Sequence, residues 1–178
     1  MKTRIPGSEY ERVAADTFAG QHPDYDLNAM AVVFNLVRLT NRITKDLETV
    51  VHRPHRISFA AFRLMFSIAS AGPINAIDLA RLAGVSAGTV SSVISGLEAQ
   101  ELVERTPDPD DGRKFIVQLS LKGDRLISTL ARENNRRESE WVECLTPAET
   151  ALLAELLRKM LNHNPGTAAS LAGKDEER

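Results

Sequence analysis

A short segment near the middle of the chain carries an unusual number of hydroxyl groups. These are the side chains of Ser86, Thr89, Ser91, Ser92 and Ser95. Hydroxyls donate and accept hydrogen bonds, so such a group can contact phosphates and several kinds of base edge. The stretch from Ser86 to Gln100 contains no Lys or Arg, which excludes bidentate recognition of guanine by this segment. The alternative interpretation is that the serines form only a small polar face.

Four cationic side chains on either side of this segment are candidate DNA contacts. Arg63 and Arg81 precede it, and Arg113 and Lys114 follow it. Positive side chains beside a hydroxyl-rich surface are typical phosphate contacts. The alternative for Arg113 and Lys114 is that both side chains are simply solvated. Arg113 could instead form an ion pair with Asp111 that stiffens the loop.

The hydroxyl-rich segment is predicted to be the second helix of a bent pair. The first helix is expected over Asn75–Leu82, followed by a turn at Gly84, which can take the positive φ that such turns need. The second helix runs from Ser86 to about Gln100. Its Val90, Ile94 and Leu97 form the apolar stripe that packs it against the first. This is the pattern of a helix-turn-helix, whose second helix enters the major groove of DNA.

Two short β-type runs follow, over Leu102–Thr106 and Phe115–Leu119. The second alternates apolar and polar residues, as a half-buried strand does. The polar loop between them contains two prolines and a glycine, which exclude a helix there. A hairpin directly after the second helix of such a pair is a wing.

Long helices are predicted on either side of this region. One is capped by Asp26, runs to about His52 and ends at Pro54. At about 40 Å it is longer than the core of one small domain, so its excess apolar face is expected to cover another subunit. Ser58 caps a shorter helix that is apolar nearly all round.

The C-terminal part is predicted to be helical as well. Ser120 caps a helix whose middle, residues 132–140, is almost wholly polar and is expected to be solvated. Thr146 and Glu149 form a predicted capping box for a last, leucine-rich helix. A weaker capping box is predicted for Asn75 and Asp78.

Composition narrows the functional class. The chain has 178 residues, 43% of them hydrophobic, and a formal charge of only −2, so any contact with DNA must come from a local basic patch. Cys144 is the only cysteine, and His52, His55 and His163 lack further ligands at regular spacing, so neither a metal site nor another cofactor is expected. No nucleophile pair or phosphate-binding loop supports an enzyme. The sequence lacks a membrane-length apolar run and a signal-peptide core, which predicts a cytoplasmic protein.

The wing sequence resembles a known family. Leu102-Val103-Glu104-Arg105, Asp108-Pro109-Asp110-Asp111-Gly112-Arg113 and Val117-Gln118-Leu119-Ser120 are similar to the wing of MarR-type transcriptional regulators, and Leu79-Ala80-Arg81-Leu82-Ala83-Gly84-Val85-Ser86 fits the same family. The resemblance covers roughly residues 26–163. It implies an all-α fold with a small β wing (α+β), in which a winged helix-turn-helix lobe is carried on a helical dimerisation body. It also favours insertion of Arg113 into the minor groove.

The expected organisation has five parts: an N-terminal arm over 1–25, a long dimerisation helix over 26–56, the winged helix-turn-helix over 57–120, C-terminal dimerisation helices over 121–163, and a disordered tail over 164–178. The expected function is a regulator, most simply a repressor, that binds a pseudopalindromic operator as a homodimer. The rival hypothesis is a winged-helix interaction module that binds a protein and has lost DNA binding.

In regulators of this family, the junction of the first two long helices borders a pocket for aromatic acids. Here that junction carries a basic rim formed by Arg38, Arg42, His52, Arg53, His55 and Arg56. The resemblance implies a small aromatic anion as effector, held by Arg42, Arg53, His55, Phe59 and Phe62. The alternative is a solvated helix face.

Overall fold

The computed structural model describes residues 9–22, 24–108 and 115–163. They form two compact units, one ending at Arg137 and the other beginning at Glu138, and each is described by itself. The first unit contains α1 (Tyr10–Ala19), α2 (Leu27–Leu47), η1 (Glu48–His52), η2 (Arg53–His55), α3 (Phe59–Ala71), β1 (Ile74–Asn75), α4 (Ala76–Ala83), α5 (Ala87–Ala99), β2 (Val103–Pro107) and β3 (Phe115–Leu119). The boundary between the units lies within α6 (Leu121–Val142), and α7 (Pro147–Leu161) belongs to the second unit.

The first long helix has the predicted cap and a wider last turn. The Asp26 side chain accepts a hydrogen bond from the backbone N–H of Ala29 at 2.9 Å. After Leu47 the helix continues as the π-helical turn η1, in which the N–H of Arg53 bonds to the carbonyl of Glu48. The short 3₁₀ turn η2 then contains Pro54, which ends the helix where the sequence predicted. The arm forms α1, and its Tyr10 ring lies 5.3 Å from the Phe34 ring of α2.

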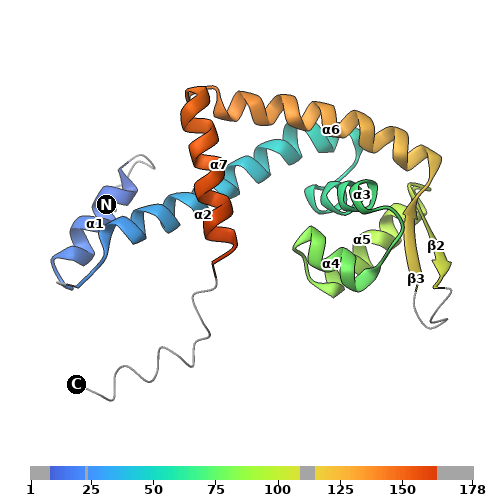
Figure 1. Ribbon diagram of the computed structural model, residues 1–178, viewed down its shortest axis with the longest axis horizontal. Coiled ribbons are helices and arrows are strands. Elements are labelled where there is room, and N and C mark those ends of the chain that lie inside the picture. Colours follow the sequence, from blue (N-terminus) through green and yellow to red (C-terminus); the bar gives the residue numbers. More distant parts are fainter. Residues whose placement is uncertain (1–8, 23, 109–114, 164–178) are drawn as a thin grey trace, which may run out of the picture. The chain divides into compact units, whose positions relative to one another are not determined.

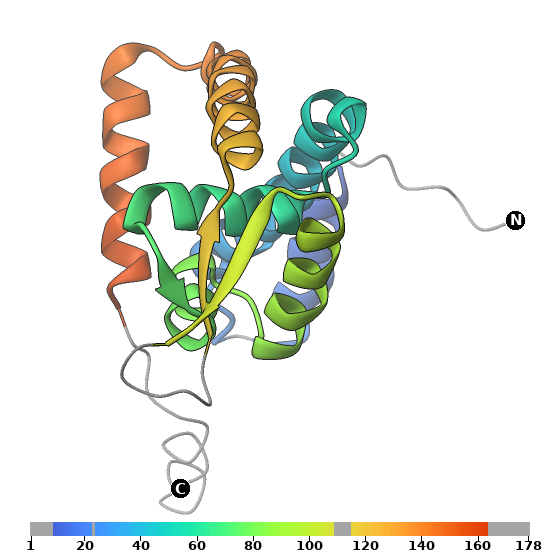
Figure 2. The same ribbon diagram turned by 90° about the vertical axis from the view of Figure 1, so that its right-hand side faces the viewer.

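The core of the first unit is built around α3. Ser58 caps this helix by accepting from the N–H of Ala61 at 3.1 Å, and Leu64 and Met65 are fully buried. The helices α4 and α5 and the β2–β3 hairpin gather around α3 (Figures 1 and 2).

The sheet has three antiparallel strands in the order β1-β3-β2. Both predicted strands are present, and Val103 pairs with Leu119. The sequence analysis missed β1, where Ile74 pairs with Val117. A two-residue strand is too short to show an alternating pattern.

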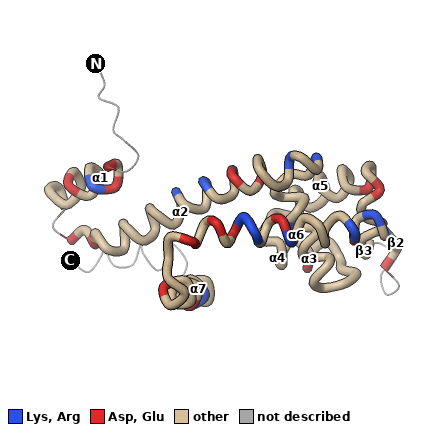
Figure 3. Tube along the Cα trace, turned by 90° about the horizontal axis from the view of Figure 1, so that it is seen from above, with Lys and Arg blue, Asp and Glu red and all other residues tan. Residues whose placement is uncertain are grey.

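The middle of α6 corrects one prediction. Ser120 caps this helix, since its hydroxyl accepts from the N–H of Gly123 at 3.0 Å. Basic and acidic residues follow one another along the helix (Figure 3). However, Asn134 is only 4% exposed, and Arg137 makes two bonds of 2.7 and 2.8 Å to Asp46 of α2. The predicted solvated stretch is therefore wrong for these residues, because partners far away in the sequence satisfy their polar groups.

In the second unit, α7 begins with a capping box and a proline. Thr146 and Glu149 form the predicted capping box, whereas Asn75 and Asp78 do not. The Asn75 side chain accepts from the N–H of Asp78, but the Asp78 carboxylate bonds to the Asn75 side chain instead of its backbone. The predicted tail over 164–178 lies outside the described residues.

Among the described helices, none alone is long and apolar enough to cross a membrane. The bent pair α4–α5 passes the same test only when its two helices are taken together.

Candidate nucleic-acid interface

The helices α4 and α5 meet at an angle of 104°. Gly84 ends α4 with φ +60°, the left-handed conformation that the turn requires. Ser86 then caps α5, its side chain accepting from the N–H of Thr89 at 3.1 Å. The angle is within the range of helix-turn-helix pairs, roughly 90–120°.

The inner and outer faces of α5 differ sharply. Val90, Ile94 and Leu97 are at most 2% exposed and fix the helix to the core. The opposite face carries Gly88, Ser92 and Gly96, all exposed and four residues apart. Among these three residues only Ser92 has a side chain larger than hydrogen, a hydroxymethyl group.

Most of the hydroxyls predicted to face DNA are already engaged. Ser86 and Thr89 bond to each other at 2.9 Å. The Ser95 hydroxyl accepts from Arg105 at 3.0 Å and donates to the Ser91 carbonyl at 3.1 Å. Within the described residues, the side-chain hydroxyls of Ser91 and Ser92 have no hydrogen-bond partner. Ser91 lines a cavity, which leaves Ser92 as the hydroxyl presented outward.

The two flanking arginines differ in their surroundings. Arg81 is an exposed cation whose guanidinium lies 3.0 Å from Asp78 on the same helix. The hydrogen bonds from Asn75 and Arg81 lower the pKa of the Asp78 carboxyl, so this pair remains charged at neutral pH. Arg63 lies over the Phe59 ring at 5.9 Å. Its guanidinium is close enough to Gly84 that a Cβ there would lie 2.9 Å from Nη2.

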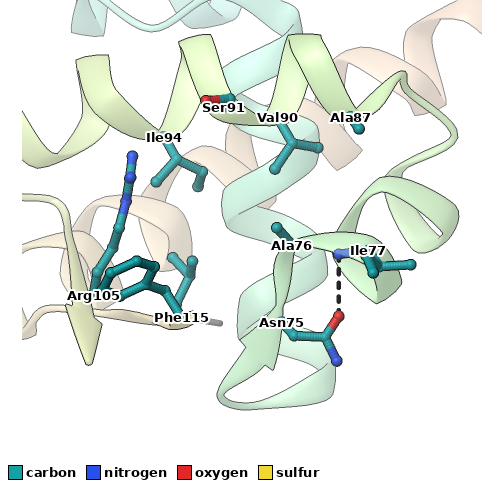
Figure 4. A pocket seen from close by; sticks show the side chains of 10 residues that line it. Asn75, Ala76, Ile77, Ala87, Val90, Ser91, Ile94, Arg105 and Phe115 are labelled. Atoms are coloured by element: carbon teal, nitrogen blue, oxygen red, sulfur yellow. Dashed lines mark hydrogen bonds between the residues drawn. The ribbon is translucent and has the colours of Figure 1, made fainter. Parts of the chain in front are cut away.

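The wing is described only along its strands. The predicted tip residues Asp111, Arg113 and Lys114 lie outside the described residues. The strand residue Arg105, which the sequence analysis did not select, turns toward α5 (Figure 4). Its guanidinium lies 2.9 Å from the Glu98 carboxylate. Strand alternation could have identified it, because Arg105 shares a face with the buried Val103.

A cavity of about 270 Å³ separates the first half of α5 from the strands. Its lining is Asn75, Ala76, Ile77, Ala87, Val90, Ser91, Ile94, Arg105, Phe115 and Val117. Figure 4 shows Arg105 and Phe115 rising from the strands on one side and Val90 and Ile94 descending from α5. The walls are mostly apolar.

The junction of α2 and α3 is where the effector residues were predicted, and the structure brings together only some of them. Phe62 stacks on the His52 ring at 4.5 Å, and Phe59 lies 5.7 Å from the same ring. Arg53 is exposed and pairs weakly with Glu48 at 3.5 Å. Arg42 lies on an exposed turn of α2, about 16 Å along the helix axis before Arg53.

The histidines of the predicted basic rim point inward or toward α6. His52 is fully buried, and its Nε2 lies 3.0 Å from the Asn134 side-chain oxygen. Burial lowers its pKa, partly offset by the hydrogen bond to Asn134. His52 is therefore a neutral core residue, and its assignment to a cationic rim was wrong. His55 lies 2.9 Å from Glu133 of α6.

A right-angled helix pair followed by an antiparallel hairpin defines a winged helix-turn-helix protein, a class that binds DNA. Residues 57–115 match the model of the MarR family. The chain is 29% identical over 138 residues to an uncharacterized HTH-type transcriptional regulator, YwaE of Bacillus subtilis, covering 78% of this chain and 81% of that protein. Residues 57–115 thus match a MarR-family domain, and the chain is similar over most of its length to an HTH-type transcriptional regulator.

Two solved structures of regulators resemble this chain in both fold and sequence. A mutant MarR from E. coli, complexed with operator DNA, has a TM-score of 0.64 and 26% identity, with 77% of this chain and 99% of that chain covered. BpsR of Bordetella bronchiseptica, whose DNA binding is regulated by 6-hydroxynicotinic acid, has a TM-score of 0.69 and 25% identity, with 75% and 94% covered. The predicted fold class, mainly helical with a small β wing, is confirmed.

Proposed function

We propose that this regulator acts as a repressor, binding a pseudopalindromic operator as a homodimer and leaving it when a small aromatic anion binds. The observation that carries the proposal is the 104° pair α4–α5 with a capped, solvent-facing second helix. Two-fold symmetry would place two copies of α5 about 34 Å apart, one turn of DNA. The complex of the similar E. coli protein with operator DNA supports this use of the fold.

The contacts follow from the geometry of the helix pair. The start of α5 enters the major groove, where its free N–H groups and Ser92 meet phosphates and base edges. Arg81 and Arg63 lie on the two preceding helices and supply flanking phosphate contacts. Arg113 and Lys114 reach the neighbouring groove from the wing tip, on the strength of the sequence pattern alone.

A titration of labelled DNA with the protein tests the proposal. The protein should bind a duplex from its own upstream region more tightly than a random duplex of equal length, as measured by fluorescence anisotropy. Arg81→Gln should weaken both duplexes alike and lower the salt slope by about one contact. Equal affinity of the wild type for both duplexes would contradict a sequence-specific regulator.

The rival, a protein-binding module, is favoured by one specific observation. The outward face Gly88, Ser92 and Gly96 offers almost no groups for base reading, but it would let another helix approach closely. If the protein binds no duplex even at low salt, this rival replaces the DNA-binding proposal.

The effector site is proposed at the junction of α2 and α3. Phe59 provides a half-buried aromatic wall, and Arg53 and His55 provide nearby positive or hydrogen-bonding groups. The regulation of BpsR by 6-hydroxynicotinic acid supports an aromatic acid as the class of ligand. A ligand there would fix the angle between α2 and the DNA-binding helices, with a coupling of about 1–3 kcal/mol.

A thermal-shift screen of benzoates and hydroxynicotinates identifies the effector. A hit should raise Tm and release labelled DNA, and Arg53→Gln should weaken both effects. Arg12→Gln, an equally exposed arginine on α1, is the matched control. If no compound does both, the protein is a constitutive DNA binder.

A further inference from the structure

The recognition helix α5 is not packed against the wing along its whole length. Its second half is fixed by Ile94 and Leu97, both almost fully buried beside Leu102 and Val103. Its first half, from Ala87 to Ser91, lies over the cavity of about 270 Å³. Val90 of this half is 1% exposed and packs into the core, whereas the exposed Ala87 and Ser91 border the cavity and have fewer packing partners on that side.

One polar group bridges the edge of this cavity. Nη2 of Arg105, from β2, donates to the Ser95 hydroxyl at 3.0 Å and lies 2.9 Å from Oε2 of Glu98. The Ser95 hydroxyl in turn donates a hydrogen bond to the backbone carbonyl of Ser91 at 3.1 Å, within α5. Ser95 and Glu98 lie three residues apart on one side of α5, so a single guanidinium of β2 contacts the helix over one turn.

We propose that Arg105 is a positioning residue that sets the orientation of the recognition helix on the wing, and that discrimination between DNA sequences depends on it. This inference rests on the proposed DNA binding and extends it. Arg105 acts through α5 and is not itself a phosphate contact. Its side chain is only 29% exposed, and its guanidinium already faces the Glu98 carboxylate.

This role predicts an effect different from the loss of a phosphate contact. When a cation that neutralises a phosphate is removed, the salt slope falls and all sequences weaken alike. When the orientation of α5 changes, contacts to base edges are lost, whereas the number of neutralised phosphates stays the same. Specific affinity should therefore fall while non-specific affinity and the salt slope remain.

The experiment compares four variants on a duplex selected from a random library with the wild-type protein. Arg105→Gln and Glu98→Gln each remove one side of the ion pair, and the double variant completes a thermodynamic cycle. Arg81→Gln is the control, because it removes an exposed cation that does not contact Arg105, Ser95 or Glu98. Anisotropy titrations with the selected and a random duplex, at several salt concentrations, give the specificity ratio and the salt slope.

We expect Arg105→Gln to reduce the ratio of specific to random affinity by roughly tenfold or more, the loss of one base contact, at an unchanged salt slope. Glu98→Gln should reproduce most of this loss, and the double variant should be no worse than Arg105→Gln. Equal weakening of both duplexes with a lower slope would make Arg105 a direct phosphate contact. An unchanged ratio would overturn the proposal as well.

A measurement without DNA separates this inference from the proposed function. In Arg105→Gln, backbone amides of α5 should exchange hydrogen faster than in the wild type, whereas those of α3 should be unchanged. If the wild type binds no duplex, the proposed function fails, and this comparison still decides whether Arg105 holds the helix. Should Arg105→Gln fail to fold, Ser95→Ala removes the neutral bond alone and must show the same local effect.

Discussion

His52 is a titratable side chain that the fold keeps neutral. Its ring is fully buried against Phe62. Nε2 lies 3.0 Å from the Asn134 oxygen, and Nδ1 has no partner within the described part of the chain. A proton on Nδ1 would place an unpaired charge in the core. Glu48 favours that charge and His55 opposes it, but desolvation is the largest effect and lowers the pKa.

The stability of the protein should therefore fall as the pH is lowered. The folded-state pKa of His52 lies below its unfolded value of about 6.5. Between these two values the unfolded chain binds more protons, so the free energy of unfolding decreases as the pH falls through this window. In His52→Gln, which can still donate to Asn134 but does not titrate, the decrease between pH 7 and pH 5 should be smaller. Urea unfolding at a series of pH values measures it, and parallel curves for the two proteins would refute the assignment.

Some residue roles could not be predicted from the sequence. The partners of His52, His55 and Asp46 lie 82, 78 and 91 residues away, on α6. Periodicity shows which face of a helix is apolar, but it does not show which polar residue on another helix lies opposite. The same limit hid Arg105, whose partner Ser95 precedes it by ten residues in a different element.

At the scale of elements, local chemistry predicts boundaries well. Asp26, Ser58, Asn75 and Thr146 are N-caps, as predicted, because each bonds to the first turn of its own helix. Ser86, predicted only as the start of α5, is an N-cap as well. The π-helical turn η1 was not predicted, since it depends on how α2 meets its neighbours. Nor was the cavity beneath α5, because it depends on how α5 is spaced from β1, α4, β2 and β3.

Two glycines in helices should respond oppositely to alanine. At Gly123, near the start of α6, a Cβ would lie 1.9 Å from the Leu102 carbonyl oxygen. Gly123→Ala should therefore destabilise the protein by about 1–3 kcal/mol or more, since backbone must shift. At Gly96 no atom lies within 4 Å of an added Cβ, so Gly96→Ala should stabilise by about 0.5–1 kcal/mol. Thermal or urea unfolding of both variants provides the comparison, and the same sign for both would contradict it.

At the scale of the whole molecule, apolar surface remains uncovered on the helices assigned to a dimer body. On α2, Val32, Val33 and Val37 are 52–54% exposed. On α7, considered separately, Leu152, Leu156 and Leu161 are 55%, 48% and 84% exposed. Surfaces of this kind are typical of subunit interfaces.

We expect light scattering to give twice the mass of one chain at micromolar concentration. The double variant Val33→Lys, Val37→Lys places two charges on one face of α2 and should shift the protein toward a monomer. Ile77→Lys changes an apolar residue that is 71% exposed on α4 and should leave the mass unchanged. A wild-type monomer would exclude the proposed dimer.

The outer face of the recognition helix has a consequence for how such a protein changes its target. Gly88 and Gly96 contribute no side chain, and Ser92 lies between them, opposite the buried Val90 and Ile94. A new side chain at position 92 therefore meets no core neighbour, and the only proposed DNA contact that it replaces is the hydroxyl of Ser92. Ser92→Arg should keep the stability of the parent within about 0.5 kcal/mol, and it should add a preference for guanine at one position of each half-site. Selecting duplexes from a random library with each protein and comparing the selected sequences measures this preference. A single substitution would then change the operator that the protein binds. Two copies of a duplicated gene would need only that one step to recognise different operators.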